Sequence, residues 1–136
     1  MIQIIAGQKG EGKTKRLIEM ANKSGKIANG HVVFIDDDNR HMYDLHYNIR
    51  FVKTTYEILD EMVLFGFICG IMSQDSDIEH IYIDGINNIV KAMDNERLDG
   101  FIKKIERVSV GENVDFTMII SEKADELPVS AQKYVI

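Results

Sequence analysis

Cysteine, proline and tryptophan are nearly absent from this sequence of 136 residues, which contains one cysteine, one proline and no tryptophan. With Cys69 alone the chain forms no internal disulfide, and the apolar residues around Cys69 predict a small, buried side chain. The single proline, Pro128, leaves no stiff linker, and no repeat or low-complexity tract divides the chain. This length and uniformity predict a single domain over residues 1–136.

Long apolar runs and an excess of positive charge are missing as well. The apolar stretch 62–72 has 11 residues, well short of the roughly 20 that a membrane-spanning helix needs. The N-terminal residues lack the charged and long apolar regions of a secretory signal, so we expect a cytoplasmic protein without a membrane span. The net charge of −6 is untypical of a dedicated nucleic-acid-binding protein, so no nucleic-acid partner is indicated.

Short apolar runs alternate with segments of helical spacing along the chain. We predict strands at 2–6, 31–35, 49–52, 81–83 and 116–120, with a last short strand at 134–136. We predict helices at 13–23 with a stop at Ser24-Gly25, from Thr54 or Thr55 to about Ser73, at 86–93 and at 98–108. Such an alternation forms a parallel sheet with helices on both faces. The sequence thus predicts an α/β fold of three αβα layers, with a mostly parallel sheet of about five strands.

The first predicted strand leads into a glycine-rich segment that fits the pattern G-x-x-x-x-G-K-S/T at every fixed position, namely Gly7-Gln8-Lys9-Gly10-Glu11-Gly12-Lys13-Thr14. In this pattern the glycines let backbone N–H groups converge on phosphate oxygens, and the following helix adds the positive end of its dipole. Lys13 would place its ammonium group on the β- and γ-phosphates, and Thr14 would offer its hydroxyl to Mg²⁺. All eight residues are therefore candidate nucleotide-binding residues.

On these residues the chain resembles the P-loop NTPases, with residues 7–14 as the Walker A motif. The partition and septum-site ATPases carry an additional lysine where this motif has Gln8, so that subgroup is disfavoured. The chain is also similar to short bacterial proteins labelled twitching-motility (PilT-like) ATPases, specifically over Walker A and more loosely over FIDDDNR and IYIDG. The resemblance implies the P-loop fold and binding of ATP with Mg²⁺. A pilus-retraction motor would carry a further N-terminal domain, which we do not expect because the P-loop strand begins at Ile2.

Asp84 follows the predicted strand 81–83 and is the Walker B aspartate by resemblance. A P-loop needs an acid near Thr14 to hold hydrated Mg²⁺, so Thr14 and Asp84 are the candidate metal ligands. The alternative is that Asp84 starts a turn or caps the helix predicted at 86–93. Gly85 stands where many ATPases have a catalytic glutamate, which leaves weak hydrolysis, a base supplied elsewhere, or no hydrolysis.

RecA-like ATPases carry their catalytic carboxylate at the end of the strand that follows the P-loop helix, where this sequence has Asp36-Asp37-Asp38. We take Asp37 and Asp38, with Lys13, as candidate catalytic residues, and a solvated acidic turn is the alternative. Ser121 ends the strand predicted at 116–120, where many ATPases place a polar residue that senses the γ-phosphate; a simple turn serine fits equally well.

The sequence also contains part of a guanine-specificity motif, several arginines and several histidines. Lys123 and Asp125 resemble part of the guanine-specificity motif, but Glu122 replaces its Asn or Thr, so ATP is favoured over GTP. The arginines could serve as fingers for a neighbouring subunit of a homo-oligomer, although surface charge is the simpler interpretation of each; they include Arg40, Arg50, Arg97 and Arg107. No histidine pair has zinc-site spacing.

Three functions fit these observations. The preferred one is a slow, Mg²⁺-dependent ATPase. A regulatory module that binds the nucleotide without turnover is favoured by Gly85 and by the small size of the chain. A small nucleoside or nucleotide kinase is less favoured, because thymidine kinases have an acid after Walker B and a cysteine-rich zinc module, and this sequence has neither.

Overall fold

A computed structural model describes residues 1–54, 57–91 and 93–136. Within these residues five strands form one sheet in the order β1-β5-β4-β2-β3, and every neighbouring pair is parallel. The strands are β1 (Ile2–Ala6), β2 (His31–Asp36), β3 (Ile49–Lys53), β4 (Ile78–Ile83) and β5 (Asp115–Ile120). The predicted parallel five-stranded sheet is confirmed, and the strand boundaries differ from the prediction by at most three residues.

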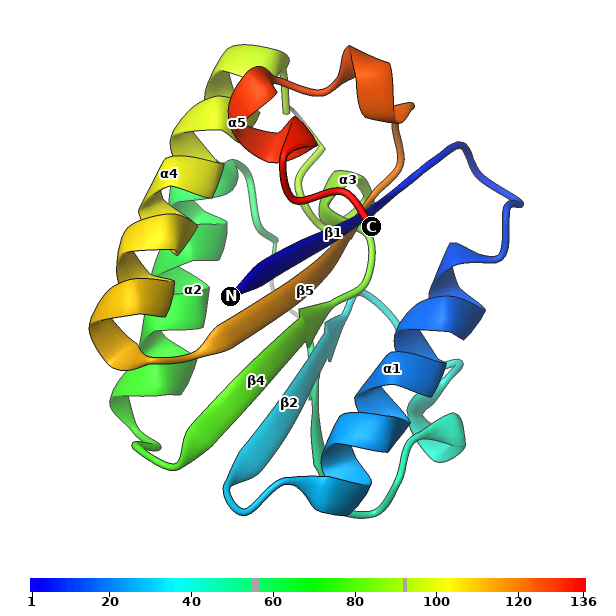
Figure 1. Ribbon diagram of the computed structural model, residues 1–136, viewed down its shortest axis with the longest axis vertical. Helices are drawn as coiled ribbons and strands as arrows, with labels where there is room; N and C mark the ends of the chain where they lie inside the picture. The colour runs from blue at the N-terminus through cyan, green and yellow to red at the C-terminus, as the bar shows by residue number, and fades with distance from the viewer. Residues whose placement is uncertain (55–56, 92) are drawn as a thin grey trace.

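Helices cover both faces of the sheet (Figure 1). α1 (Lys13–Ile27) lies on one face, and α2 (Glu61–Ser73) and α4 (Asn95–Glu112) lie side by side on the other. Four single-turn helices complete the fold: η1 (Met42–Asp44), α3 (Ile86–Ile89), η2 (Ala124–Glu126) and α5 (Val129–Gln132). The three predicted αβα layers are therefore present. None of the helices in the described ranges is long and apolar enough to cross a bilayer.

The sheet divides the apolar core into two clusters. Val32 and Phe34 of β2 pack in the cluster beneath α1, and Val33 and Ile35 pack in the cluster beneath α2 and α4. Each of these four side chains is at most 1% exposed. Because successive side chains of a strand point to opposite faces, a strand covered on both faces needs an unbroken apolar run, which is what the sequence has here.

The first helix continues past its predicted stop at Ser24-Gly25 and ends at Ile27. Gly25 lies within the helix and close to β3: a Cβ at this position would come within 2.9 Å of Ile49 Cγ1, so the missing side chain permits this close packing. The Ser24 hydroxyl contacts the Tyr82 hydroxyl beneath the helix. Both residues thus serve packing against the sheet, and the prediction that they end the helix is wrong.

The predicted start of the second long helix is also wrong. α2 begins at Glu61, where the Asp60 side chain accepts a hydrogen bond from Val63 N at 2.9 Å. Thr54 instead donates from its backbone N and its hydroxyl to the Asp36 carbonyl oxygen, at 2.9 and 3.4 Å. The other proposed cap, Thr55, lies outside the described residues.

Four smaller predictions change as well. The helix predicted at 86–93 is only the single turn α3, whereas the one predicted at 98–108 extends over all of α4 and is capped by Asp94, which accepts from Arg97 N at 2.8 Å. The last predicted strand is a single parallel bridge between Val135 and Ile4. Cys69 is partly exposed and not buried, because it lies on the flank of α2.

The strand order places the candidate residues along one edge of the sheet. Since all strands are parallel, their carboxyl ends and the loops that follow them meet at this edge. The glycine-rich loop follows β1, Ser121 follows β5, Asp84 follows β4, and the acidic turn follows β2. Ser121 therefore lies between the glycine-rich loop and Asp84.

Candidate functional site

The glycine-rich loop connects β1 to α1 and depends on backbone conformations that glycine favours. Gly7, Gly10 and Gly12 have φ values of +148°, +86° and +75°, which L-residues with side chains rarely adopt. Gly12 is the N-cap of α1, and no side chain caps this helix or places an acid in its first turn. The unpaired first-turn amides and the positive end of the helix dipole are thus available to an anion.

Side chains of the loop fold back onto it. The Lys13 ammonium group donates to the Gln8 carbonyl oxygen, and Lys13 is only 9% exposed. The Glu11 carboxylate lies against Gly7, where any side chain on residue 7 would collide with it. Gly7 N donates to the Glu122 carbonyl oxygen at 2.8 Å, which ties the loop to the segment after β5.

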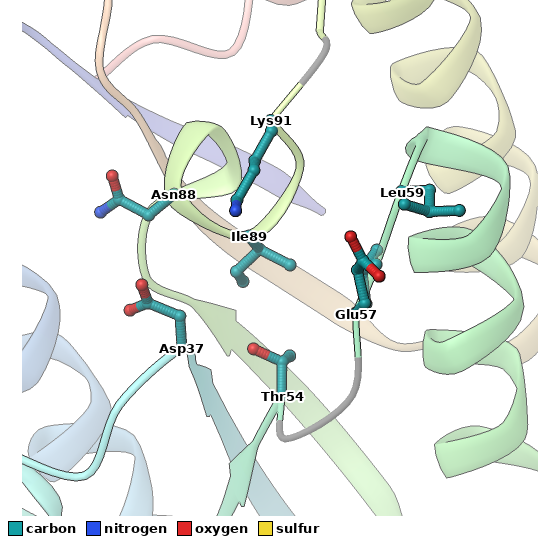
Figure 2. Close-up of a pocket in the computed structure, with 8 residues that line it drawn as sticks. Asp37, Thr54, Glu57, Leu59, Asn88, Ile89 and Lys91 are labelled. Carbon is teal, nitrogen blue, oxygen red and sulfur yellow. The ribbon is translucent and has the colours of Figure 1, made fainter.

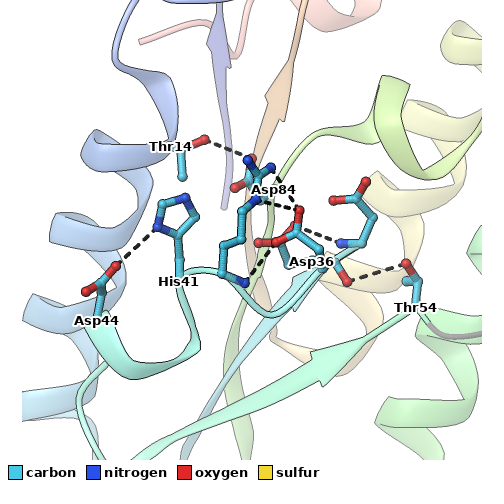
Figure 3. A network of polar contacts seen from close by, with 9 residues as sticks. Thr14, Asp36, His41, Asp44, Thr54 and Asp84 are labelled. Atoms are coloured by element: carbon cyan, nitrogen blue, oxygen red, sulfur yellow. Dashed lines mark hydrogen bonds and ion pairs between the residues drawn. The ribbon is translucent and has the colours of Figure 1, made fainter.

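Thr14 and Asp84 face each other at the carboxyl edge of the sheet. The Thr14 hydroxyl in the first turn of α1 donates to Asp84 Oδ1 at 3.4 Å (Figure 3). Asp84 N donates to the Ile35 carbonyl oxygen at 2.9 Å, and the Asp84 side chain is buried. Burial raises the pKa of Asp84, and the hydrogen bond from Thr14 partly offsets this rise. Asp84 does not cap α3, whose N-cap is Gly85, so the capping role is wrong, whereas the chain does bend at Asp84.

Asp36 is a second buried acid next to Asp84, and its residue is only 4% exposed. In the parallel pairing of β2 with β4, Ile35 lies opposite Ile83, so Asp36 and Asp84 follow at the next position of neighbouring strands. Burial, the hydrogen-bonded Asp37 and the negative charge of Asp84 raise the pKa of Asp36 to about 8. Sequence reasoning preferred Asp37 and Asp38; the signal it missed is that Asp36 directly ends the buried strand.

The two predicted catalytic acids have different surroundings. Asp37 N donates to Asp36 Oδ1 at 2.7 Å, and Asp37 lines a cavity of about 380 Å³ between the ends of β2 and β3 and α3 (Figure 2). The polar rim of this cavity includes Thr54, Glu57 and Lys91. Asp38 instead pairs with Arg40, and this contact lowers the pKa of Asp38.

A cleft of about 360 Å³ brings most of the predicted nucleotide-binding residues together. Its lining residues are Lys9, Gly10, Gly12, Lys13, Thr14, Lys15, Arg40, Asp84, Gly85, Asn88, Ile119 and Ser121. Of the predicted residues, Gly7, Gln8 and Glu11 do not line it. Four lining residues are cationic and one is acidic, although the whole chain carries a net charge of −6.

Residues that sequence reasoning did not assign to the cleft include Arg40 and Asn88. Asn88 also lines the cavity that contains Asp37, so the two hollows adjoin. The amide of its neighbour Asn87 accepts from Ser121 N at 2.8 Å and so holds the segment after β5 in place. No short motif marks these residues: Asn88 enters the site through the position of α3, and Arg40 enters it from the segment after β2.

The oxygen atoms in this region suit a hard cation. The Thr14 hydroxyl and the Asp84 carboxylate could hold Mg²⁺, which prefers oxygen ligands together with water and phosphate. A second group of oxygens comes from Asp36, Asp37 and Asp38, whose carboxylates lie within 4.8 Å of one another. The first pair is next to the glycine-rich loop and therefore the better placed to serve a bound phosphate.

No protein-family model and no curated protein matches this chain. Among solved structures, a KaiC-like protein from the hyperthermophilic archaeon Pyrococcus horikoshii is similar over 98% of this chain, with a TM-score of 0.68. The fold is that of a P-loop NTPase. At 14% identity the likeness shows the fold alone, and the chain spans 66% of the length of that KaiC-like protein, just under two thirds.

Proposed function

We propose that the chain binds ATP with Mg²⁺ at the cleft and hydrolyses it slowly, with residues 1–136 acting as one nucleotide-binding domain. The observation that carries this proposal is the hydrogen bond between Thr14 and Asp84 beside the glycine-rich loop. It joins a hydroxyl and a carboxylate of two distant segments where a phosphate-bound metal would need both. The cytoplasmic location, the homo-oligomer and the likeness to PilT-like proteins stay predictions.

Each part of the loop has a role in this binding. The backbone N–H groups of the loop and the first turn of α1 donate to phosphate oxygens. When the nucleotide binds, the Lys13 ammonium group exchanges its hydrogen bond to the Gln8 carbonyl oxygen for contacts with the phosphates. Bound Mg²⁺ supplies neutralising charge, and Thr14 and Asp84 are the residues that would hold it.

Slow turnover follows from the acids near the cleft. Gly85 follows Asp84, Asp38 is paired with Arg40, and Asp36 is buried with a raised pKa. Asp37 is then the acid best placed to orient an attacking water, because it is half-buried and lines the adjoining cavity. Because so few acids near the cleft are free to act on water, a module that binds the nucleotide and does not hydrolyse it is the second candidate.

Phosphate release from ATP and Mg²⁺ tests the proposal, with Lys13→Ala as the comparison. Lys13-dependent release without an added acceptor supports the ATPase. Tight binding without release supports the regulatory module. Formation of ADP and a nucleoside monophosphate only with an added nucleoside, without free phosphate, supports a kinase, whose acceptor we would place in the cavity of Figure 2. Release above background at the same rate in both proteins would not depend on Lys13 and would contradict the proposed ATPase.

A further inference from the structure

Arg40 lies on the cleft of its own chain. It follows β2, whereas the glycine-rich loop follows β1, and the ends of β5 and β4 separate the two in the sheet. Arg40 nevertheless lines the same cleft as Lys13 and Thr14. Cations of two separate segments thus line the cleft, those of the glycine-rich loop and α1 and that of the segment after β2.

The Arg40 guanidinium group is held in place by Asp38. Nε and Nη2 of Arg40 lie 2.9 and 2.8 Å from Asp38 Oδ2, and the backbone N of Arg40 donates to Asp38 Oδ1 at 2.9 Å. Asp38 is therefore bonded to both the main chain and the side chain of Arg40. The Nη1 group has no protein acceptor among the described residues, and the Arg40 side chain is 79% exposed.

We propose that Arg40 binds the terminal phosphate of the nucleotide in its own chain, and that Asp38 is the positioning residue for its guanidinium group. The inference rests on the proposed function and deepens it. A guanidinium group offers paired N–H donors that match phosphate oxygens. Since the loop and Lys13 serve the phosphates from the β1 side, a cation from the β2 side meets the end of the triphosphate that projects across the cleft.

This assignment changes the interpretation of two residues. Arg40 is neither plain surface charge nor a finger for a neighbouring subunit, because it lines the cleft of its own chain. Asp38 acts through Arg40 and is no general base, because its Oδ2 atom already accepts the Arg40 contacts. The pairing keeps the extended loop after β2 from carrying an isolated positive charge beside the cleft when the nucleotide is absent.

Isothermal titration with ADP and with the non-hydrolysable analogue AMP-PNP, both with Mg²⁺, tests the inference. Arg40→Ala should weaken AMP-PNP binding about tenfold, as for loss of one charge-assisted hydrogen-bonding group, and change ADP binding less than twofold. Arg40→Lys keeps the positive charge but lacks the paired N–H donors of the guanidinium group, so it should weaken AMP-PNP binding less than Arg40→Ala does. Arg107→Ala, which removes an exposed arginine of α4, is the matched control and should change neither affinity.

Asp38→Ala tests the positioning role. It should weaken AMP-PNP binding by a smaller factor, and the double variant Asp38→Ala/Arg40→Ala should bind no more weakly than Arg40→Ala, because Asp38 acts only through Arg40. Additive losses, or an unchanged or higher affinity of Asp38→Ala, would overturn this role.

The role of Arg40 and the proposed nucleotide binding can fail separately. Equal losses of ADP and AMP-PNP affinity in Arg40→Ala, or no loss, would overturn the assignment of Arg40 and leave the proposed function intact. If the unmodified chain binds neither nucleotide, the proposed function is wrong, and the role of Arg40 falls with it.

Discussion

The Thr14 hydroxyl lies 3.4 Å from the Asp84 carboxylate, although 70 residues separate them in the chain. The contact joins the first turn of α1 to the end of β4 across β5, the strand between β1 and β4. It is the point where the two halves of a metal site would meet, and it supplies the first test of the site.

Asp84→Asn should remove most of the Mg²⁺ dependence of ATP affinity. The amide keeps the shape of the side chain and can accept from Thr14, but it lacks the negative charge that holds a hydrated cation. We expect the ratio of affinities with and without Mg²⁺ to fall by about tenfold or more in isothermal titration. Asp125→Asn, an exposed acid of η2, is the control. An unchanged ratio in Asp84→Asn would contradict the assignment.

Asp37→Asn should lower phosphate release and leave AMP-PNP affinity nearly unchanged. A carboxylate that orients water or accepts its proton contributes about 10²–10⁴-fold to a rate. The expected loss is at the low end of this range, since the proposed turnover is slow. If Asp37→Asn releases phosphate at the normal rate while Asp36→Asn does not, the buried acid Asp36 is the one that acts.

Gly12→Ala and Gly66→Ala should change stability in opposite directions. Gly12 has a φ of +75°, where an alanine is strained, so its replacement should lower the free energy of unfolding by about 1–2 kcal/mol. Gly66 lies inside α2, with nothing within 4 Å of an added Cβ, so alanine there should raise it by about 0.5–1 kcal/mol. Urea unfolding of both variants measures this, and a stabilising Gly12→Ala would show that the loop does not need its left-handed residue.

The free energy of unfolding should fall as the pH is lowered from about 6.5 to about 4, because of His80. Burial lowers the pKa of His80 to about 4; the Asp115 carboxylate opposes this shift and the N-terminal ammonium group adds to it. The unfolded chain therefore binds a proton at a higher pH than the folded chain, so acid favours unfolding. The shift corresponds to a loss on the order of 3 kcal/mol.

His80→Gln is the variant that checks this pH effect. Glutamine does not titrate and can still reach the Thr117 hydroxyl, which lies 2.7 Å from His80 Nε2. In urea unfolding at pH 7 and pH 4.5 its stability should change less than that of the unmodified chain, whereas His41→Gln should keep the full dependence. Equal pH dependence in all three proteins would show that His80 is not the titrating group.

Much of the architecture could be predicted because it depends on local patterns. Short apolar runs located most of the strands, since buried parallel strands need apolar side chains on both faces. The run at 49–52 is interrupted by Arg50, and it forms β3 at the edge of the sheet. The boundaries that were wrong involve long-range contacts: the helical Gly25 packs closely against Ile49, and Thr54 forms a hydrogen bond to Asp36 rather than beginning a helix. Neither contact, with Ile49 or with Asp36, can be predicted from the residues next to it in the sequence.

By itself, the sequence predicted the glycine-rich loop, the parallel α/β fold and a candidate role for Asp84, because each follows from residue types at short, regular spacing. Only the tertiary structure decided that Asp36 is the buried acid and that Arg40, held by Asp38, lines the cleft. The physical reason is that burial, and which loops meet at one cleft, depend on the strand order, and the strand order depends on packing between segments far apart in the chain.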